Sequence, residues 1–117
     1  MNGIFLRFYM REDQRHGHHL LYTWLLREAQ ALGLHGGTVF RGVAGFGHHG
    51  KLHFAHFFEL AGELPVQIDF VVTEEEAAKL LDVVERAGVR VFYVKMPVIF
   101  GVTNPDATDA PEFRRHR

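Results

Sequence analysis

Cysteine and serine are both absent from this chain of 117 residues. The lack of cysteine excludes disulfides, thiolate nucleophiles and thiolate metal ligands. The lack of serine leaves threonine as the remaining aliphatic hydroxyl nucleophile. Glu59 and Asp69 lie on different predicted segments with no evident partner, and no group of residues indicates a substrate. We therefore expect a protein that is not an enzyme.

An excess of positive charge and a long apolar run are also missing. The 13 Lys and Arg residues face 14 Asp and Glu residues, which gives a formal net charge of −1 with nine histidines counted as neutral. Nucleic-acid binding needs many cations to neutralise phosphates, so we expect no nucleic-acid partner. No apolar run approaches the ~20 residues that span a membrane, and Arg7 interrupts the apolar N-terminus where a secretory signal needs its core. The predicted location is cytoplasmic, without membrane insertion.

The apolar pattern predicts strands and two helices within one domain. Strands are predicted at 4–10, 38–44, 66–72 and 89–95, and a further extended piece at 53–60. Pro97 ends the last strand or marks it as a sheet edge. Apolar residues three and four apart predict a helix over 18–33 and another between Thr73 and Gly88, where TEEE has the sequence of a capping box.

The C-terminal residues differ from the rest. Residues 104–117 are polar, contain two prolines and end in RRHR. We therefore predict a domain at 1–103 and a mobile polar tail at 104–117.

The order β-α-β-β-α-β predicts an α+β ferredoxin-like sandwich, in which two helices cover one face of a four-stranded antiparallel sheet. Bulky aromatic side chains nevertheless occur on both faces of the predicted strands: Phe5, Phe8, Tyr9, Phe54, Phe57, Phe58, Phe92 and Tyr93. The uncovered face would be a large exposed apolar patch, so we expect a closed homo-oligomer.

Residues 41–56, RGVAGFGHHGKLHFAH, hold four glycines and four histidines. Glycines let backbone N–H groups approach an anion without a Cβ in the way, and Arg41 and Lys51 would add charge for a phosphate. Neutral imidazoles bind divalent metals where several converge. Three interpretations stay open: a phosphate-binding loop, a metal site, or a bulge and loop at the end of a strand.

Several motifs resemble those of PII signalling proteins. VAGFG at 43–47 closes the second strand, and ELPVQIDFVVTEEE at 63–76 is similar to the strand that leads into the second PII helix. The similarity is greater to PII-like proteins of the domain-of-unknown-function one-ninety family. Their pattern resembles HG-x-x-L-Y at 16–22 (here with one extra residue), GLHGGTVFRGVAGFG at 33–47 and KLH at 51–53. The resemblance covers roughly residues 4–96.

The resemblance implies a trimer with ligand clefts between subunits. It implies a small anionic ligand, an adenine nucleotide among the candidates, bound by Arg41, Gly42, Gly45, Phe46, Gly47, His48, His49, Lys51, His53 and His16. PII proteins hold nucleotide phosphates on a glycine- and lysine-rich loop after the second helix. Here ERAGVRVF supplies one glycine, with Arg86 and Arg90 as its cations.

The resulting hypothesis is a PII-like regulatory switch. Ligand binding would order residues 48–62, which would then engage or release a partner such as a membrane transporter or another regulated protein. This segment lacks the tyrosine that PII proteins present for modification.

A second hypothesis is a divalent-metal-binding protein resembling CutA, which shares the trimeric ferredoxin-like plan. Its ligands would be His48, His49 and His53. On one strand His53 and His56 would face opposite sides, so a shared ion would need a bulge or another subunit.

Overall fold

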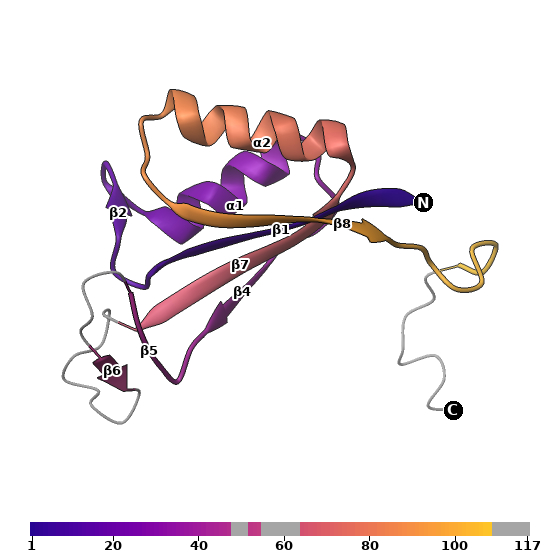
Figure 1. Ribbon diagram of the computed structural model, residues 1–117. Helices are drawn as coiled ribbons and strands as arrows, with labels where there is room; N and C mark the ends of the chain where they lie inside the picture. Colours follow the sequence, from indigo (N-terminus) through magenta and orange to yellow (C-terminus); the bar gives the residue numbers. More distant parts are fainter. Residues whose placement is uncertain (48–51, 55–63, 109–117) are drawn as a thin grey trace.

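The computed structural model describes residues 1–47, 52–54 and 64–108 (Figure 1). Its elements are β1 (Asn2–Arg11), β2 (Arg15–His16), β3 (His19–Leu20), α1 (Leu21–Ala31), β4 (Thr38–Arg41), β5 (Ala44–Phe46), β6 (Leu52–Phe54), β7 (Pro65–Val72), α2 (Glu74–Arg86) and β8 (Phe92–Ile99). The helices are shorter and less apolar than a membrane span requires over the described residues.

The main sheet has four strands in the order β4-β7-β1-β8, and every neighbouring pair is antiparallel. Both helices lie on the same face of this sheet (Figure 1). The predicted α+β ferredoxin-like sandwich is therefore confirmed. Two short ribbons, β2–β3 and β5–β6, lie outside the main sheet.

Buried side chains alternate with outward-facing ones along the two central strands, β1 and β7, and the buried ones build the core. Ile4, Leu6, Phe8 and Met10 of β1 and Val66, Ile68, Phe70 and Val72 of β7 are all buried. Each large side chain buried in this way stabilises the fold by about 1.5–3 kcal/mol. The helices add Leu21, Leu25 and Ala29 from α1, and Ala77, Leu80 and Val84 from α2. The alternate residues of β1 and β7 consequently face away from the helices.

The two helices begin in different ways. The predicted capping box of α2 is confirmed: Glu76 N donates to Thr73 Oγ1 at 3.1 Å, and Thr73 N donates to Glu76 Oε1 at 2.9 Å. Helix α1 begins at Leu21 without a side-chain cap, so its predicted start at residue 18 is wrong. Residues 15–20 form the β2–β3 ribbon instead, and Gly17 turns it with a φ of 62°.

Two predicted strand boundaries are also wrong. Strand β4 ends at Arg41 and not at residue 44: Gly42 N still donates to Pro65 O at 2.7 Å, and the chain then leaves the sheet as β5. Strand β8 begins at Phe92 and continues through Pro97, which an edge strand with one neighbour tolerates. Of the extended piece predicted at 53–60, residues 53 and 54 belong to β6, and the rest lies outside the described residues. The domain boundary after residue 103 stays a prediction.

Candidate functional site

The glycine-rich segment leaves the main sheet at the end where β1 and β4 stop and β7 begins. Glu12 N donates to Leu64 O at 2.8 Å, and Gly42 N donates to the next carbonyl, Pro65 O, at 2.7 Å. The residue after β1 and the residue after β4 are thus fixed to the same short piece of backbone.

Two of the candidate glycines have a packing role against Pro65. A Cβ at Gly42 would lie 2.8 Å from Pro65 Cγ, and a Cβ at Gly45 would lie 3.0 Å from the same atom. The contact at Gly42 is closer than real Cβ atoms make, and the contact at Gly45 is tight enough that the Pro65 ring would have to move by a few tenths of an ångström. A Cβ at Gly47 would meet nothing within 4 Å. This packing fits the bulge-and-loop interpretation at Gly42 and Gly45, while Gly47 has room for a side chain among the described residues.

Arg41, the last residue of β4, forms an ion pair with Glu12. Arg41 Nη2 donates to Glu12 Oε2, which comes from the turn after β1. The Arg41 side chain is 62% exposed and that of Glu12 is 17% exposed. The cation predicted to meet a ligand is therefore accessible to solvent but already holds an internal carboxylate. Glu12 carried no sequence signal, because its partner is 29 residues away in the chain.

The short β5–β6 ribbon brings together two predicted site segments. Gly45 lies opposite His53, and Phe46 lies opposite Leu52. The Phe46 side chain is 70% exposed. A single exposed phenylalanine is common on protein surfaces, and this ring is accessible for an apolar contact to a ligand or to another subunit.

His16 lies apart from the glycine segment, in the β2–β3 ribbon. Its ring lies against Trp24 of α1, with centroids 4.5 Å apart and planes tilted by 53°. Arg15 Nη1 donates to His18 O at 3.1 Å and stiffens the turn. This packing gives the HG motif a structural role, and contact between His16 and a ligand stays a prediction.

Several predicted residues cannot be placed. His48, His49 and Lys51 lie outside the described residues, and His53 is described through its backbone alone. In the described part of the chain no three His, Asp or Glu side chains gather as metal ligands. The predicted metal ligands therefore stay untested.

The link between α2 and β8 differs from a phosphate-binding loop. Gly88 ends α2 with a φ of 72°, and Arg86 Nε donates to Asp82 Oδ2 at 3.0 Å within the helix. The one glycine of this link thus ends the helix. Arg90 is the exposed cation among residues 87–91.

The face of the main sheet that the helices leave uncovered, here called the open face, is largely apolar. Its exposed side chains come from several strands: Phe40 at 50%, Tyr9 at 37%, Val71 at 50%, Phe92 at 69% and Met96 at 46%. Tyr9 and Phe92 lie opposite each other with ring centroids 5.7 Å apart. The predicted exposed aromatic patch is present in the subunit.

An ion pair stands at the centre of the open face, and the sequence alone did not indicate it. Arg7 Nε donates to Asp69 Oδ1 at 2.8 Å, and Arg7 Nη2 donates to Asp69 Oδ2 at 3.0 Å. The guanidinium carbon lies 5.1 Å from the Phe5 ring centroid and 5.9 Å from that of Tyr9. Hydrogen bonds to Asp69 are the main reason that the pKa of Arg7 is raised above its ordinary value. Asp69, which the sequence left without a partner, is thus fully engaged.

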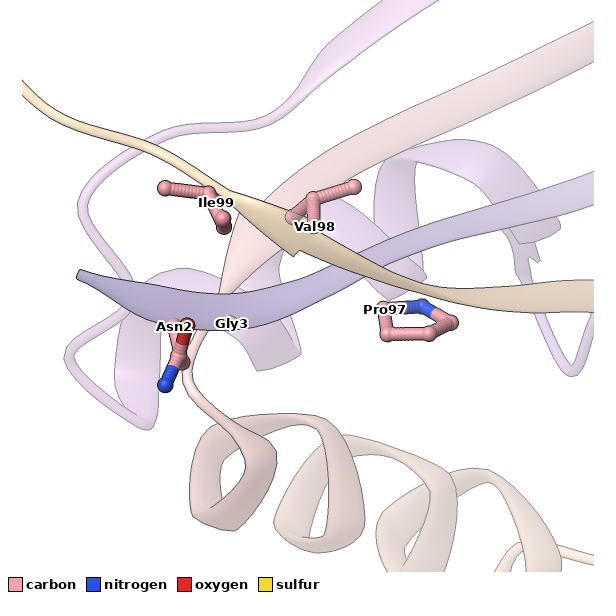
Figure 2. Close-up of a pocket in the computed structure, with 5 residues that line it drawn as sticks. All are labelled: Asn2, Gly3, Pro97, Val98 and Ile99. Carbon is pink, nitrogen blue, oxygen red and sulfur yellow. The ribbon is translucent and has the colours of Figure 1, made fainter.

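A shallow hollow of about 470 Å³ lies at the opposite end of β1 from the glycine segment. Asn2, Gly3, Pro97, Val98 and Ile99 line it, and Figure 2 shows them on the first residues of β1 and the last residues of β8. These side chains carry no charge, so the hollow is poorly suited to an anion. It includes none of the predicted site residues.

Residues 3–97 match the family DUF190, described as "Uncharacterized ACR, COG1993". A relative from Aquifex aeolicus (strain VF5), a UPF0166 protein, is 34% identical over 77 residues, which cover 66% of this chain and 73% of the relative. A UPF0166 protein from Methanocaldococcus jannaschii is 33% identical over 76 residues, 65% of this chain and 69% of the relative. The chain belongs to the DUF190 family, as its motifs predicted.

Solved structures of PII-like proteins share the fold. One is CPII, a nitrogen regulatory PII-like protein from Thiomonas intermedia K12 bound to ADP, AMP and bicarbonate, with a TM-score of 0.60, 19% identity, and coverage of 84% of this chain and 87% of CPII. Another is a protein from Thermus thermophilus assigned to PII-like signalling, with a TM-score of 0.59, 19% identity, and coverage of 84% and 88%. At this level of identity the likeness establishes the PII-like fold.

Proposed function

We propose that this protein is a PII-like regulatory protein that acts as a homotrimer and binds a small anionic ligand, such as an adenine nucleotide, in clefts between subunits. The main support is the combination of DUF190 membership with the fold of CPII, which is bound to ADP, AMP and bicarbonate. Its action would lie in ligand-dependent binding to a partner and not in catalysis.

The open face supports the assembly part of the proposal. It presents Phe40, Tyr9, Phe92 and Met96 to solvent in the isolated subunit, and monomeric proteins rarely expose contiguous apolar patches of more than a few hundred Å². The central charges of Arg7 and Asp69 neutralise each other within the subunit. Identical copies can therefore cover this face with apolar contacts alone.

The end of the sheet near Arg41 supports the ligand part. Arg41 offers a largely exposed guanidinium, a Cβ at Gly47 would meet no described atom within 4 Å, and Phe46 is an exposed aromatic ring. An arginine fork, a glycine backbone that an anion can approach and an apolar ring are suited to a phosphate and a base. Residues 48–62 follow directly in the chain, so a ligand bound here is well placed to control that segment and, through it, a partner.

Calorimetric titration with ATP, ADP, AMP and cyclic dinucleotides, together with sedimentation velocity, tests this proposal. We expect a trimer, and at least one nucleotide that binds below millimolar concentration. Arg41→Gln should weaken binding by about tenfold, whereas the matched change Arg27→Gln on the exposed side of α1 should leave it unchanged. A monomer in dilute solution would refute the assembly. The absence of heat with every nucleotide at millimolar concentration would refute nucleotide binding.

The metal-binding hypothesis receives no comparable support. The structures described above are PII-like proteins, and the side chains of the predicted ligands His48, His49 and His53 lie outside the described part of the chain.

A further inference from the structure

We propose that Glu12 is an internal competitor for the anion that Arg41 binds. In the free subunit the Glu12 carboxylate occupies the Arg41 guanidinium, and a phosphate group has to displace it. This inference rests on the proposed function, because it concerns how the same ligand site is regulated.

The side chain of Glu12 is less exposed than that of Arg41. The backbone N–H of Glu12 donates to Leu64 O at 2.8 Å, and its side chain is 17% exposed against 62% for Arg41. The carboxylate thus lies on the more buried side of the pair, while the guanidinium lies on the solvent side. When the pair opens, Arg41 is the partner that can turn to a ligand.

The contact between Glu12 and Arg41 is one that a phosphate can replace. A guanidinium presents five N–H donors in a planar fork, and the bond to Glu12 uses Nη2. Phosphate accepts from such a fork through two oxygens and carries up to two charges, whereas a carboxylate carries one. Exposed ion pairs contribute little to stability, so Glu12 would tune anion affinity and would not block the site.

The competition acts on every anion alike. Because each anion has to displace the same carboxylate, Glu12 lowers the affinity of Arg41 for each of them by a similar factor. A doubly charged phosphate still binds more tightly than a monoanion, because it brings a second charge to the guanidinium.

A neighbouring ion pair provides a control with the same charge. Arg11 Nε donates to Asp13 Oδ1 at 2.9 Å at the same end of the sheet, and both side chains are about half exposed, at 55% and 48%. Asp13→Asn removes one negative charge near the site without touching Arg41. A general electrostatic effect should therefore appear equally in Glu12→Gln and Asp13→Asn.

The experiment measures affinity for ATP, pyrophosphate and bicarbonate by calorimetry in the wild type, Glu12→Gln, Glu12→Asp, Asp13→Asn and Arg41→Gln. We expect about 3–10-fold tighter binding of ATP and pyrophosphate in Glu12→Gln. Glu12→Asp keeps the charge but draws the carboxylate back, so it should shift affinity in the same direction and serves as the second variant if Glu12→Gln fails to fold. Bicarbonate should gain by a similar factor, because it displaces the same carboxylate.

The outcomes separate this inference from the proposed function. If ATP binds the wild type and neither Glu12→Gln nor Arg41→Gln changes its affinity, the inference is wrong and nucleotide binding stands. Equal gains in Glu12→Gln and Asp13→Asn also overturn it. If no nucleotide binds, the proposed ligand is wrong, and pyrophosphate decides: tighter binding to Glu12→Gln than to the wild type supports the competitor, and equal or absent binding overturns it.

Discussion

Arg7 and Asp69 form a two-point ion pair at the centre of the open face, with N···O distances of 2.8 and 3.0 Å. Residues 7 and 69 are directly opposed in the register of β1 and β7. The rings of Phe5 and Tyr9 flank the guanidinium. Each charge thus has its partner in the same subunit, and a second copy does not have to supply a counter-charge when it covers the face.

A charge placed on the open face should prevent assembly. In Phe92→Glu a carboxylate replaces a ring that is 69% exposed in the subunit, and burying an unpaired carboxylate between copies is very costly. We expect this variant to sediment as a folded monomer with an unchanged circular dichroism spectrum. Val102→Glu is the control, because Val102 is 79% exposed but lies beyond the end of β8. A Phe92→Glu protein that remains trimeric would show that the open face is not the interface.

Removing one partner of the central ion pair should weaken assembly more than removing both partners. Asp69→Asn leaves the Arg7 charge without its partner on a face that assembly covers, whereas the double variant Arg7→Met with Asp69→Leu leaves no charge. We expect Asp69→Asn to weaken the trimer by at least about tenfold in sedimentation equilibrium and the double variant to restore it. Equal assembly of the single and double variants would contradict this prediction.

These examples show which features the sequence could predict. The alternation of VQIDFVV and the TEEE capping box are local signals, and β7 and α2 follow them closely. The pairs Arg7–Asp69 and Glu12–Arg41 join residues 62 and 29 positions apart. Such pairs depend on strand register, which no local pattern specifies.

The sequence could predict the candidate site only in part, and the reason is related. Glycine is favoured both where backbone meets a ligand and where it meets another side chain. The motif could not show that Gly42 and Gly45 pack against Pro65. The β2–β3 ribbon was missed because its two-residue strands are too short to show a period.

The capping box should contribute measurably to stability. Thr73→Ala removes the hydroxyl that accepts from Glu76 N, and loss of such a cap costs about 1 kcal/mol. A loss of this size lowers the melting temperature by about 4–8 °C in a domain of this size. Thr103→Ala, at an exposed position past β8, is the control and should melt within about 1 °C of the wild type. Equal melting of the two variants would mean that the box does not stabilise α2.

The contact between His16 and Trp24 offers a spectroscopic prediction. Trp24 is the chain's one tryptophan, and the His16 ring covers part of it at 4.5 Å. His16→Ala should expose the indole and shift its fluorescence emission to longer wavelength, because water relaxes around the excited ring. His18→Ala, an exposed residue of the same turn, should leave the spectrum unchanged. Identical spectra for the two variants would contradict the contact between the two rings.

The adjacent glycines of the turn before β4 should respond very differently to alanine. A Cβ at Gly37 would collide with the ring of Phe70 and lie 3.3 Å from Leu26 Cδ2, whereas a Cβ at Gly36 would meet nothing within 4 Å. Phe70 is 1% exposed and packs edge-to-face on Phe8 at 6.1 Å, so its ring has little room to move. We expect Gly37→Ala to lower the free energy of unfolding by about 1–3 kcal/mol through overpacking. Gly36→Ala should be neutral, or stabilising by about 0.4–1 kcal/mol, because the unfolded chain loses freedom. Urea denaturation of both variants measures the difference, and a Gly37→Ala protein as stable as Gly36→Ala would show that the turn can move away from the core.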